Sequence, residues 1–129
     1  MANTVQFEVS IKGENTGKTY SGVFEVKTNL SLRDSLREDQ VRRNTLGTNP
    51  GEASDYATSI AGALAYLAVR IVNAPDFWAK SNGGVDLEDE NVLVEVNNAC
   101  VKAIQDERDK VKALATDAQK ALATKAAGA

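Results

Sequence analysis

The stretch TVQFEVSI, residues 4–11, alternates strictly between polar and apolar side chains. A two-residue period of this kind is typical of a strand that buries one face. Residues 13–17 contain two Gly and one Asn, a composition that indicates a turn. The next run, residues 18–28, places Tyr20 and Phe24 on a shared apolar face. We therefore expect an antiparallel β-hairpin at the start of the chain.

A hairpin alone is only marginally stable in water, so its apolar face must pack on helices or on another subunit. Gly22 lies on this face, between Tyr20 and Phe24. A glycine inside a strand indicates a bulge or a close approach of the backbone. We expect one of these two features at Gly22.

A first helix is expected to begin after Ser31, which is placed as its N-cap. Asp34 stands three residues later, where an acidic side chain completes a weak form of the capping box. Gly47 is expected to end the helix. The apolar stripe of this charged segment is thin and consists of Leu32, Leu36 and Val41.

A second helix is expected from Asn49 as N-cap, with Pro50 at the first helical position and Glu52 two residues later. The pattern continues to about Asn73, and Pro75 favours an end just before it. Spacings of three and four residues define one buried face of small and large apolar side chains. This face consists of Ala53, Tyr56, Ala57, Ile60, Ala61, Leu64, Leu67, Ala68 and Ile71.

A third helix is expected to begin after Asp86 and to run from about residue 87 to about residue 122. A helical pattern much longer than about 25 residues indicates a helix that projects from the core or packs on a neighbour. Its apolar stripe contains Val92, Val96, Cys100, Ala103, Ile104, Val111, Leu114, Ala118 and Leu122.

The fold class that these patterns predict is α+β, with the hairpin packed on a small helical bundle that carries a long C-terminal helix. A length of 129 residues fits one domain. We divide it into a hairpin and helical core over residues 1–108 and an Ala- and Lys-rich helical extension over residues 109–129.

The composition argues against several classes of function. The chain has no His, which is the commonest general base and metal ligand, and its single Cys excludes an internal disulfide. No apolar run approaches 18 residues, and residues 1–6 lack the pattern of a secretory signal. A net charge of −3 argues against a protein that coats nucleic acid. We expect no enzymatic activity, no cofactor, no metal site, and neither nucleic-acid nor membrane binding.

Two charged clusters have both a functional and a structural interpretation. Acidic residues at the start of the third helix suggest a cation site, but they also suit the positive end of a helix dipole, which we favour. Arginines in the first helix suggest phosphate contact, but interleaved carboxylates favour a solvated face or a polar interface. The acidic cluster is Asp86, Glu88, Asp89 and Glu90; the arginines are Arg33, Arg37, Arg42 and Arg43. Cys100 lies on an apolar stripe and is expected to be a buried, unreactive thiol.

Phe77 and Trp78 are adjacent members of a small set of aromatic residues. We expect at least one of them to lie in the core, while the other interpretation is that one anchors a partner. The residues expected to contact partner proteins lie on the hairpin, at this turn and on the tail. They are Phe7, Tyr20, Phe24, Trp78, Val111, Leu114 and Leu122.

Several short motifs resemble those of the tail assembly chaperones of long-tailed bacteriophages. The Ala-rich sequence AYLAV at residues 65–69 is followed by APDFW at residues 74–78 and by DENVL at residues 89–93. Before them, GVFEV at residues 22–26 precedes an Arg- and acid-rich segment at residues 33–43. The similarity spans roughly residues 18–108, and the extension after Asp109 departs from the family.

The resemblance implies a non-enzymatic phage morphogenesis protein that acts through protein surfaces. Such a chaperone would bind the tail tube or tape-measure protein in the host cytoplasm before polymerisation. The alternative is a virion structural protein, either a capsid decoration protein or a head–tail accessory protein, whose extension clamps neighbouring subunits such as the capsid protein. In either role we expect a homo-oligomer or a component of a larger assembly.

Overall fold

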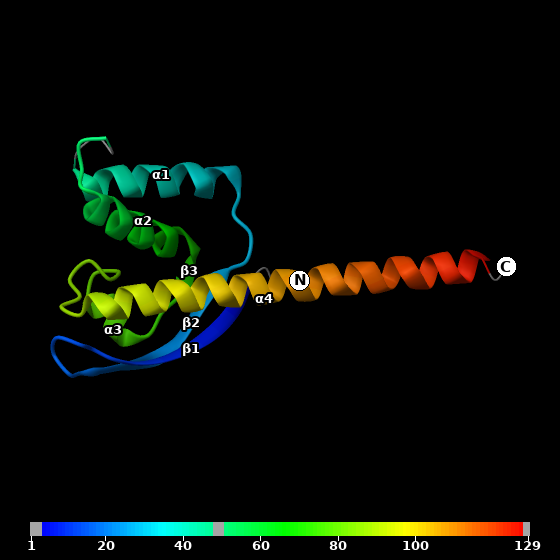
Figure 1. Cartoon of the computed structure of the whole chain (residues 1–129), viewed down its shortest axis with the longest axis horizontal. Helices are drawn as coiled ribbons and strands as arrows, with labels where there is room; N and C mark the ends of the chain where they lie inside the picture. The colour runs from blue at the N-terminus through cyan, green and yellow to red at the C-terminus, as the bar shows by residue number, and fades with distance from the viewer. Residues whose placement is uncertain (1–3, 48–50, 128–129) are drawn as a thin grey trace.

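The computed structural model describes residues 4–47 and 51–127. Four layers follow one another in Figure 1: α1, α2, the first half of α4, and a small sheet. The second half of α4 extends far beyond the other elements. In chain order, the elements are β1 (Thr4–Lys12), β2 (Thr19–Lys27), α1 (Leu32–Leu46), α2 (Asp55–Arg70), β3 (Ile71–Asn73), α3 (Asp76–Lys80) and α4 (Glu90–Ala127).

The expected hairpin is confirmed, and so is the α+β class. β1 and β2 pair antiparallel, with Phe7 opposite Phe24 and Ile11 opposite Tyr20. Alternate side chains of β1 point to α4 or to solvent, so that Val9 and Ile11 are buried while Glu8 and Ser10 are exposed. The two-residue period therefore sets which face of the sheet packs on the helices.

A third strand, β3, was not expected. The second helix ends at Arg70 rather than near Asn73, because Ile71 adopts an extended conformation and pairs with Val26 of β2. The strand order β1-β2-β3 places β2 in the centre of the sheet. The side-chain amide of Asn73 donates to the Glu25 carboxylate at 2.6 Å, which ties β3 to its neighbour. Residues 71–73 thus pair with the free edge of β2 instead of continuing the helix.

The expected termini of α1 are confirmed. The Ser31 hydroxyl accepts from the Asp34 amide at 3.1 Å, and the Asp34 carboxylate accepts in return from the Ser31 amide. Gly47 caps the other end in the left-handed conformation. The thin stripe contributes little burial, since Leu32 and Leu36 are 86% and 74% exposed. α1 packs on α2 as an outer layer.

The expected start of the second helix is wrong. α2 begins at Asp55, where the Ser54 hydroxyl accepts from the Ala57 amide at 3.1 Å and acts as the N-cap. Glu52 precedes the helix, whereas Asn49 and Pro50 lie outside the described residues. Both sites offered suitable capping chemistry, and the structure uses the one closer to the first buried turn.

The expected start of the third helix is also displaced. Residues 81–86 form consecutive turns, in which the Asp86 amide donates to the Ser81 carbonyl at 3.0 Å. α4 therefore begins at Glu90, not after Asp86. No helix continues through Pro75, as expected, and the short α3 begins directly after it. Gly22 is a site of close approach, because a Cβ there would collide with the Pro75 ring.

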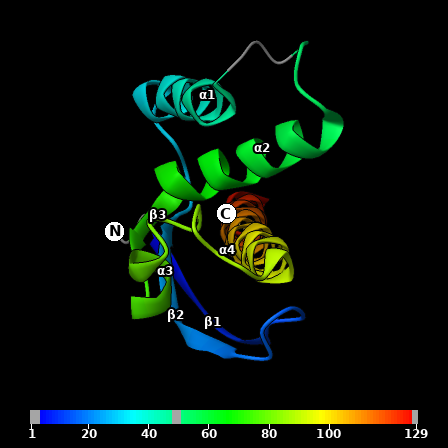
Figure 2. The ribbon, with the colours of Figure 1, turned by 90° about the vertical axis from the view of Figure 1, so that its left-hand side faces the viewer.

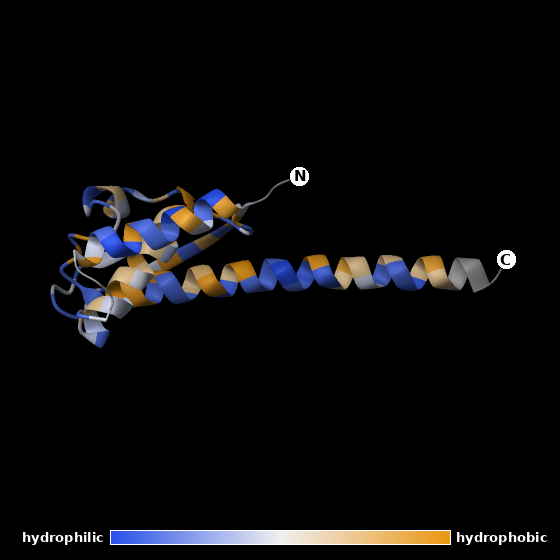
Figure 3. Ribbon diagram, turned by 90° about the horizontal axis from the view of Figure 1, so that it is seen from above, coloured by the Kyte–Doolittle hydropathy of each residue, from blue (hydrophilic) through white to orange (hydrophobic). Residues whose placement is uncertain are grey.

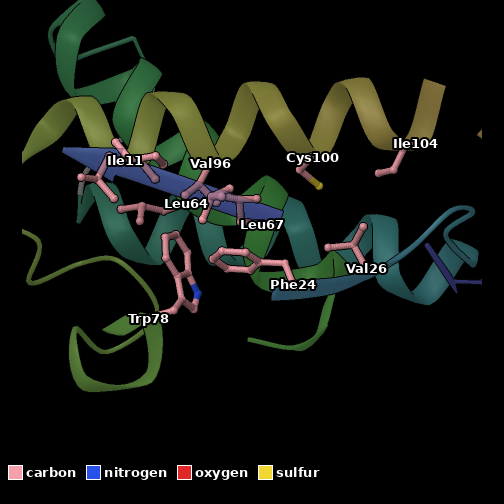
Figure 4. Close-up of a cluster of buried hydrophobic side chains, with 12 residues drawn as sticks. Ile11, Phe24, Val26, Leu64, Leu67, Trp78, Val96, Cys100 and Ile104 are labelled. Carbon is pink, nitrogen blue, oxygen red and sulfur yellow. The ribbon is translucent and has the colours of Figure 1, made fainter. Parts of the chain in front are cut away.

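The core lies between the sheet, α2 and α4 (Figure 4), and an aromatic cluster forms part of it. Phe24 stacks on Phe7 at 5.1 Å between ring centroids and meets Trp78 edge-on at 5.6 Å. Phe24 is fully buried and Trp78 is 5% exposed, while Phe77 is half-buried against Tyr20. The expectation that Phe77 or Trp78 lies in the core is confirmed.

We predict that Trp78→Ala lowers the free energy of unfolding by about 3–5 kcal/mol, because it removes a large buried ring and leaves a cavity. Chemical denaturation measures the change. Tyr56→Ala is the matched control, since Tyr56 is an aromatic residue that is 62% exposed. Equal losses in the two variants would contradict the core position of Trp78.

Candidate interaction surfaces

A buried carboxylate joins the hairpin turn to the start of α4. Asp89 has no exposed surface and accepts four hydrogen bonds from residues of the turn and β2. Its Oδ1 accepts from the amides of Asn15 and Thr16 at 2.7 and 2.9 Å. Its Oδ2 accepts from the hydroxyls of Thr16 and Tyr20 at 2.6 and 2.7 Å. We call this group the Asp89 clamp.

The Asp89 clamp holds its carboxyl group in the charged form. Burial raises the pKa of Asp89, but the hydrogen bonds from Thr16, Tyr20 and Asn15 outweigh burial and lower the pKa to about 2. The turn approaches so closely that a Cβ on Gly13 would overlap the carboxylate. Asn91 adds a second connection, because its side chain accepts from the Glu14 amide and donates to the Lys12 carbonyl, each at 3.0 Å.

Because the folded-state pKa of Asp89 lies below that of an unfolded Asp, near 3.9, the clamp stabilises the fold fully only above about pH 4. This contribution is lost as the pH falls from about 4 to about 2. We predict that Asp89→Asn unfolds at a lower temperature than the wild type at pH 7 and that the difference narrows towards pH 2. Thermal unfolding followed by circular dichroism measures both effects.

Glu88→Gln is the control for this prediction, since Glu88 is the exposed neighbour of Asp89. The control should track the wild type across the same pH range. A gap between Asp89→Asn and wild type that stays constant down to pH 2 would contradict the assignment of the titrating group.

Sequence reasoning missed the Asp89 clamp. The acidic cluster was interpreted as a whole, and only Asp89 among its four members is buried. Among the described residues, no group of three or more acidic or Cys side chains is arranged to hold a metal ion. The partners of Asp89 lie more than 65 positions away in the sequence, so no local spacing signals the contact.

The second half of α4 forms an arm that the other described elements leave uncovered. Ile104 is the last buried side chain, and the Arg108 guanidinium donates to the Thr28 carbonyl at 3.0 Å. We define the arm as residues 109–123, whose side chains are all exposed. Figure 3 shows apolar and polar residues alternating along it. Val111, Leu114 and Leu122 are 58%, 69% and 67% exposed.

A groove between α2 and α4 is a second surface with apolar character. Figure 2 shows α2 crossing above α4. The Tyr56 hydroxyl donates to the Glu90 carboxylate at 3.0 Å across the end where both helices begin. The residues that line the groove are Asp55, Tyr56, Ser59, Ile60, Ala63, Glu90, Leu93, Val94 and Asn97.

The outer edge of β1 is a third surface, formed by backbone groups. Because the Gly13 amide donates to the Lys18 carbonyl, the odd-numbered residues of β1 bond to β2 and the even-numbered ones face outward. The Asn91 side chain donates to the Lys12 carbonyl, and no other strand among the described residues lies along this edge. A strand edge of this kind is a template for pairing with another chain.

The predicted contact residues fall into three groups. Phe24 and Trp78 are core side chains, fully buried and 5% exposed, so neither offers the exposed contact surface expected of it. Phe7 and Tyr20 are half-buried, and the Tyr20 hydroxyl donates to Asp89 as part of the Asp89 clamp. The three arm residues, by contrast, are exposed together along one stretch of helix. They are Val111, Leu114 and Leu122.

The other candidates from the sequence have structural roles. Cys100 is fully buried, and burial raises the pKa of its thiol to about 11, as expected of an unreactive packing residue. In α1, Arg42 and Arg43 both pair with Asp39, at 2.6 and 3.0 Å. The other carboxylates of α1 pair outside the helix, Asp34 with Lys27 of β2 and Glu38 with Arg70 of α2.

No protein-family model, curated protein or solved structure matches this chain. Within the part of the chain that the structure describes, no helix has the length and apolar content needed to cross a membrane.

Proposed function

We propose that this chain is a non-enzymatic morphogenesis protein of a tailed bacteriophage and that it acts through protein surfaces, as a tail assembly chaperone does. The arm carries the proposal that the protein acts through surfaces, and it lies in the extension that departs from the chaperone family. It is a preformed helix that begins where the core ends and presents Val111, Leu114 and Leu122 to solvent. The motif resemblance over residues 18–108 supports the assignment to phage assembly.

A projecting helix with an apolar stripe is suited to docking on another protein. Amphipathic helices bind by laying their apolar face into a hydrophobic groove, with anchors at helical spacing. Because the arm continues α4 without a break, it does not need to fold when it binds, and the entropic cost of association is reduced. The free edge of β1 is a further place for a partner strand. Expected partners are the tail tube, tape-measure or capsid protein.

A second role, that of a virion structural protein, is favoured by the length of the arm. From residue 109 to residue 127 the helix extends for about 28 Å, enough to reach a neighbouring subunit. Quantitative mass spectrometry of purified particles separates the two roles. A fixed, high copy number relative to the capsid protein indicates a decoration or head–tail component, while absence from particles indicates a chaperone of the host cytoplasm.

We predict that Leu114→Glu in the phage genome lowers the titre of infectious particles by about tenfold or more, because it places a charge at the centre of the contact surface. The melting temperature of the purified variant should match that of the wild type, since Leu114 is 69% exposed. Plaque titration and thermal unfolding measure the two effects.

Leu36→Glu is the matched control, because Leu36 is also an exposed helical leucine, 74% exposed on α1. It should leave the titre unchanged. A wild-type titre for Leu114→Glu would contradict the proposed role of the arm.

A further inference from the structure

We propose that the arm of one copy docks in the groove between α2 and α4 of a second copy, so that the protein associates head to tail. This inference deepens the proposed function by naming the partner of the arm. It rests on the proposed function in one respect, that the arm is a protein-binding surface. It joins two exposed surfaces of the same chain that have similar length and complementary charge.

The arm cannot reach the groove of its own chain. One wall of the groove is the beginning of α4, from Glu90 to Asn97, and the arm is the continuation of that same helix. A straight helix cannot fold back on its first turns, and Figure 1 shows the arm leading away from the core. Any contact between the two surfaces therefore joins two copies.

The charges of the two surfaces are complementary. The residues that line the groove include the acidic Asp55 and Glu90 and no basic residue. The arm carries three lysines and two aspartates over residues 109–123. At 100° per residue, Lys110 and Lys112 lie on opposite sides of Val111 and border its stripe. The two lysines can therefore pair with Asp55 and Glu90. Both pairs of charges lie beside apolar side chains.

The lengths of the two apolar surfaces also agree. The groove follows α2 from Asp55 to Ala63, which is about 12 Å of helix. Val111 and Ala118 are separated by about 10 Å along the arm, with Leu114 between them. Because Ala115 and Ala118 are small, the arm can approach Ile60 and Val94 closely. The groove is thus about as long as two turns of helix, and Val111 and Leu114 would be the anchors.

The charges set the direction of the arm. Asp55 and Glu90 lie at the end of the groove where α2 and α4 begin, and there the Tyr56 hydroxyl donates to the Glu90 carboxylate. Placing Lys110 and Lys112 at this end makes the arm run in the same direction as the α4 that receives it. Towards the other end, the Asn97 side-chain oxygen is buried and has no hydrogen-bond donor among the described residues. Docking of the arm of one copy on the groove of another is a heterologous contact, and its repetition builds a ring or a filament.

The test uses three full-length variants. Leu114→Glu disables the arm, and Val94→Lys disables the groove, since Val94 lines it and is 46% exposed. Leu36→Glu on α1 is the control, because Leu36 is a similarly exposed helical leucine outside both surfaces. Circular dichroism verifies that each variant is folded, and sedimentation velocity measures association over a range of concentrations.

We expect the wild type and Leu36→Glu to associate progressively with concentration. The arm variant and the groove variant should each show a dissociation constant raised by about tenfold or more. A mixture of these two should form a dimer that does not grow, because one intact arm meets one intact groove.

Three results would overturn this inference: a monomeric wild type, association of Val94→Lys equal to that of the wild type, or no dimer in the mixture. None of these bears on the phage titre of Leu114→Glu, so failure of self-association and failure of the proposed function are distinguishable.

Discussion

Burial of one face of α4 organises this molecule. From Val92 to Ile104, that face packs on the sheet and on α2, and the Asp89 clamp fixes the point where the helix begins. The same apolar stripe continues along the arm, where none of the described residues covers it. One helix therefore contributes both to the core and to an exposed apolar surface. A continuous helix cannot supply its own cover, and for this reason we propose a second copy as the partner of the arm.

Local signals predicted the parts of the fold whose chemistry is local. The alternation over residues 4–11 and the capping box at Ser31 and Asp34 use neighbours in sequence, and both appear as expected. The third strand, β3, depends on a free edge of β2 that is distant in sequence. The Asp89 clamp also escaped prediction, because a buried acid with distant partners looks the same in sequence as its exposed neighbours.

For the interaction surfaces too, the sequence predicted the features with local signals and missed those formed by distant residues. The exposed arm was predicted, because a helical pattern too long for the core must leave it. The groove was not predicted, since its two walls come from helices separated in sequence and its residues also read as ordinary core positions. Phe24 and Trp78 were misplaced for a related reason: aromatic residues favour both cores and binding surfaces, and only the assembled fold distinguishes the two. Head-to-tail association, as we propose it, would present the same surface again with each added subunit.

Disulfide trapping tests the docking of the arm on the groove most directly. Cys100 is fully buried with a raised thiol pKa, so new cysteines at Leu114 on the arm and Ser59 in the groove can be studied in its presence. Under mild oxidation, a mixture of the two full-length single variants, Leu114→Cys and Ser59→Cys, should give a mixed dimer that joins arm to groove. A dimer linked only between two arms, or no mixed product, would contradict the account.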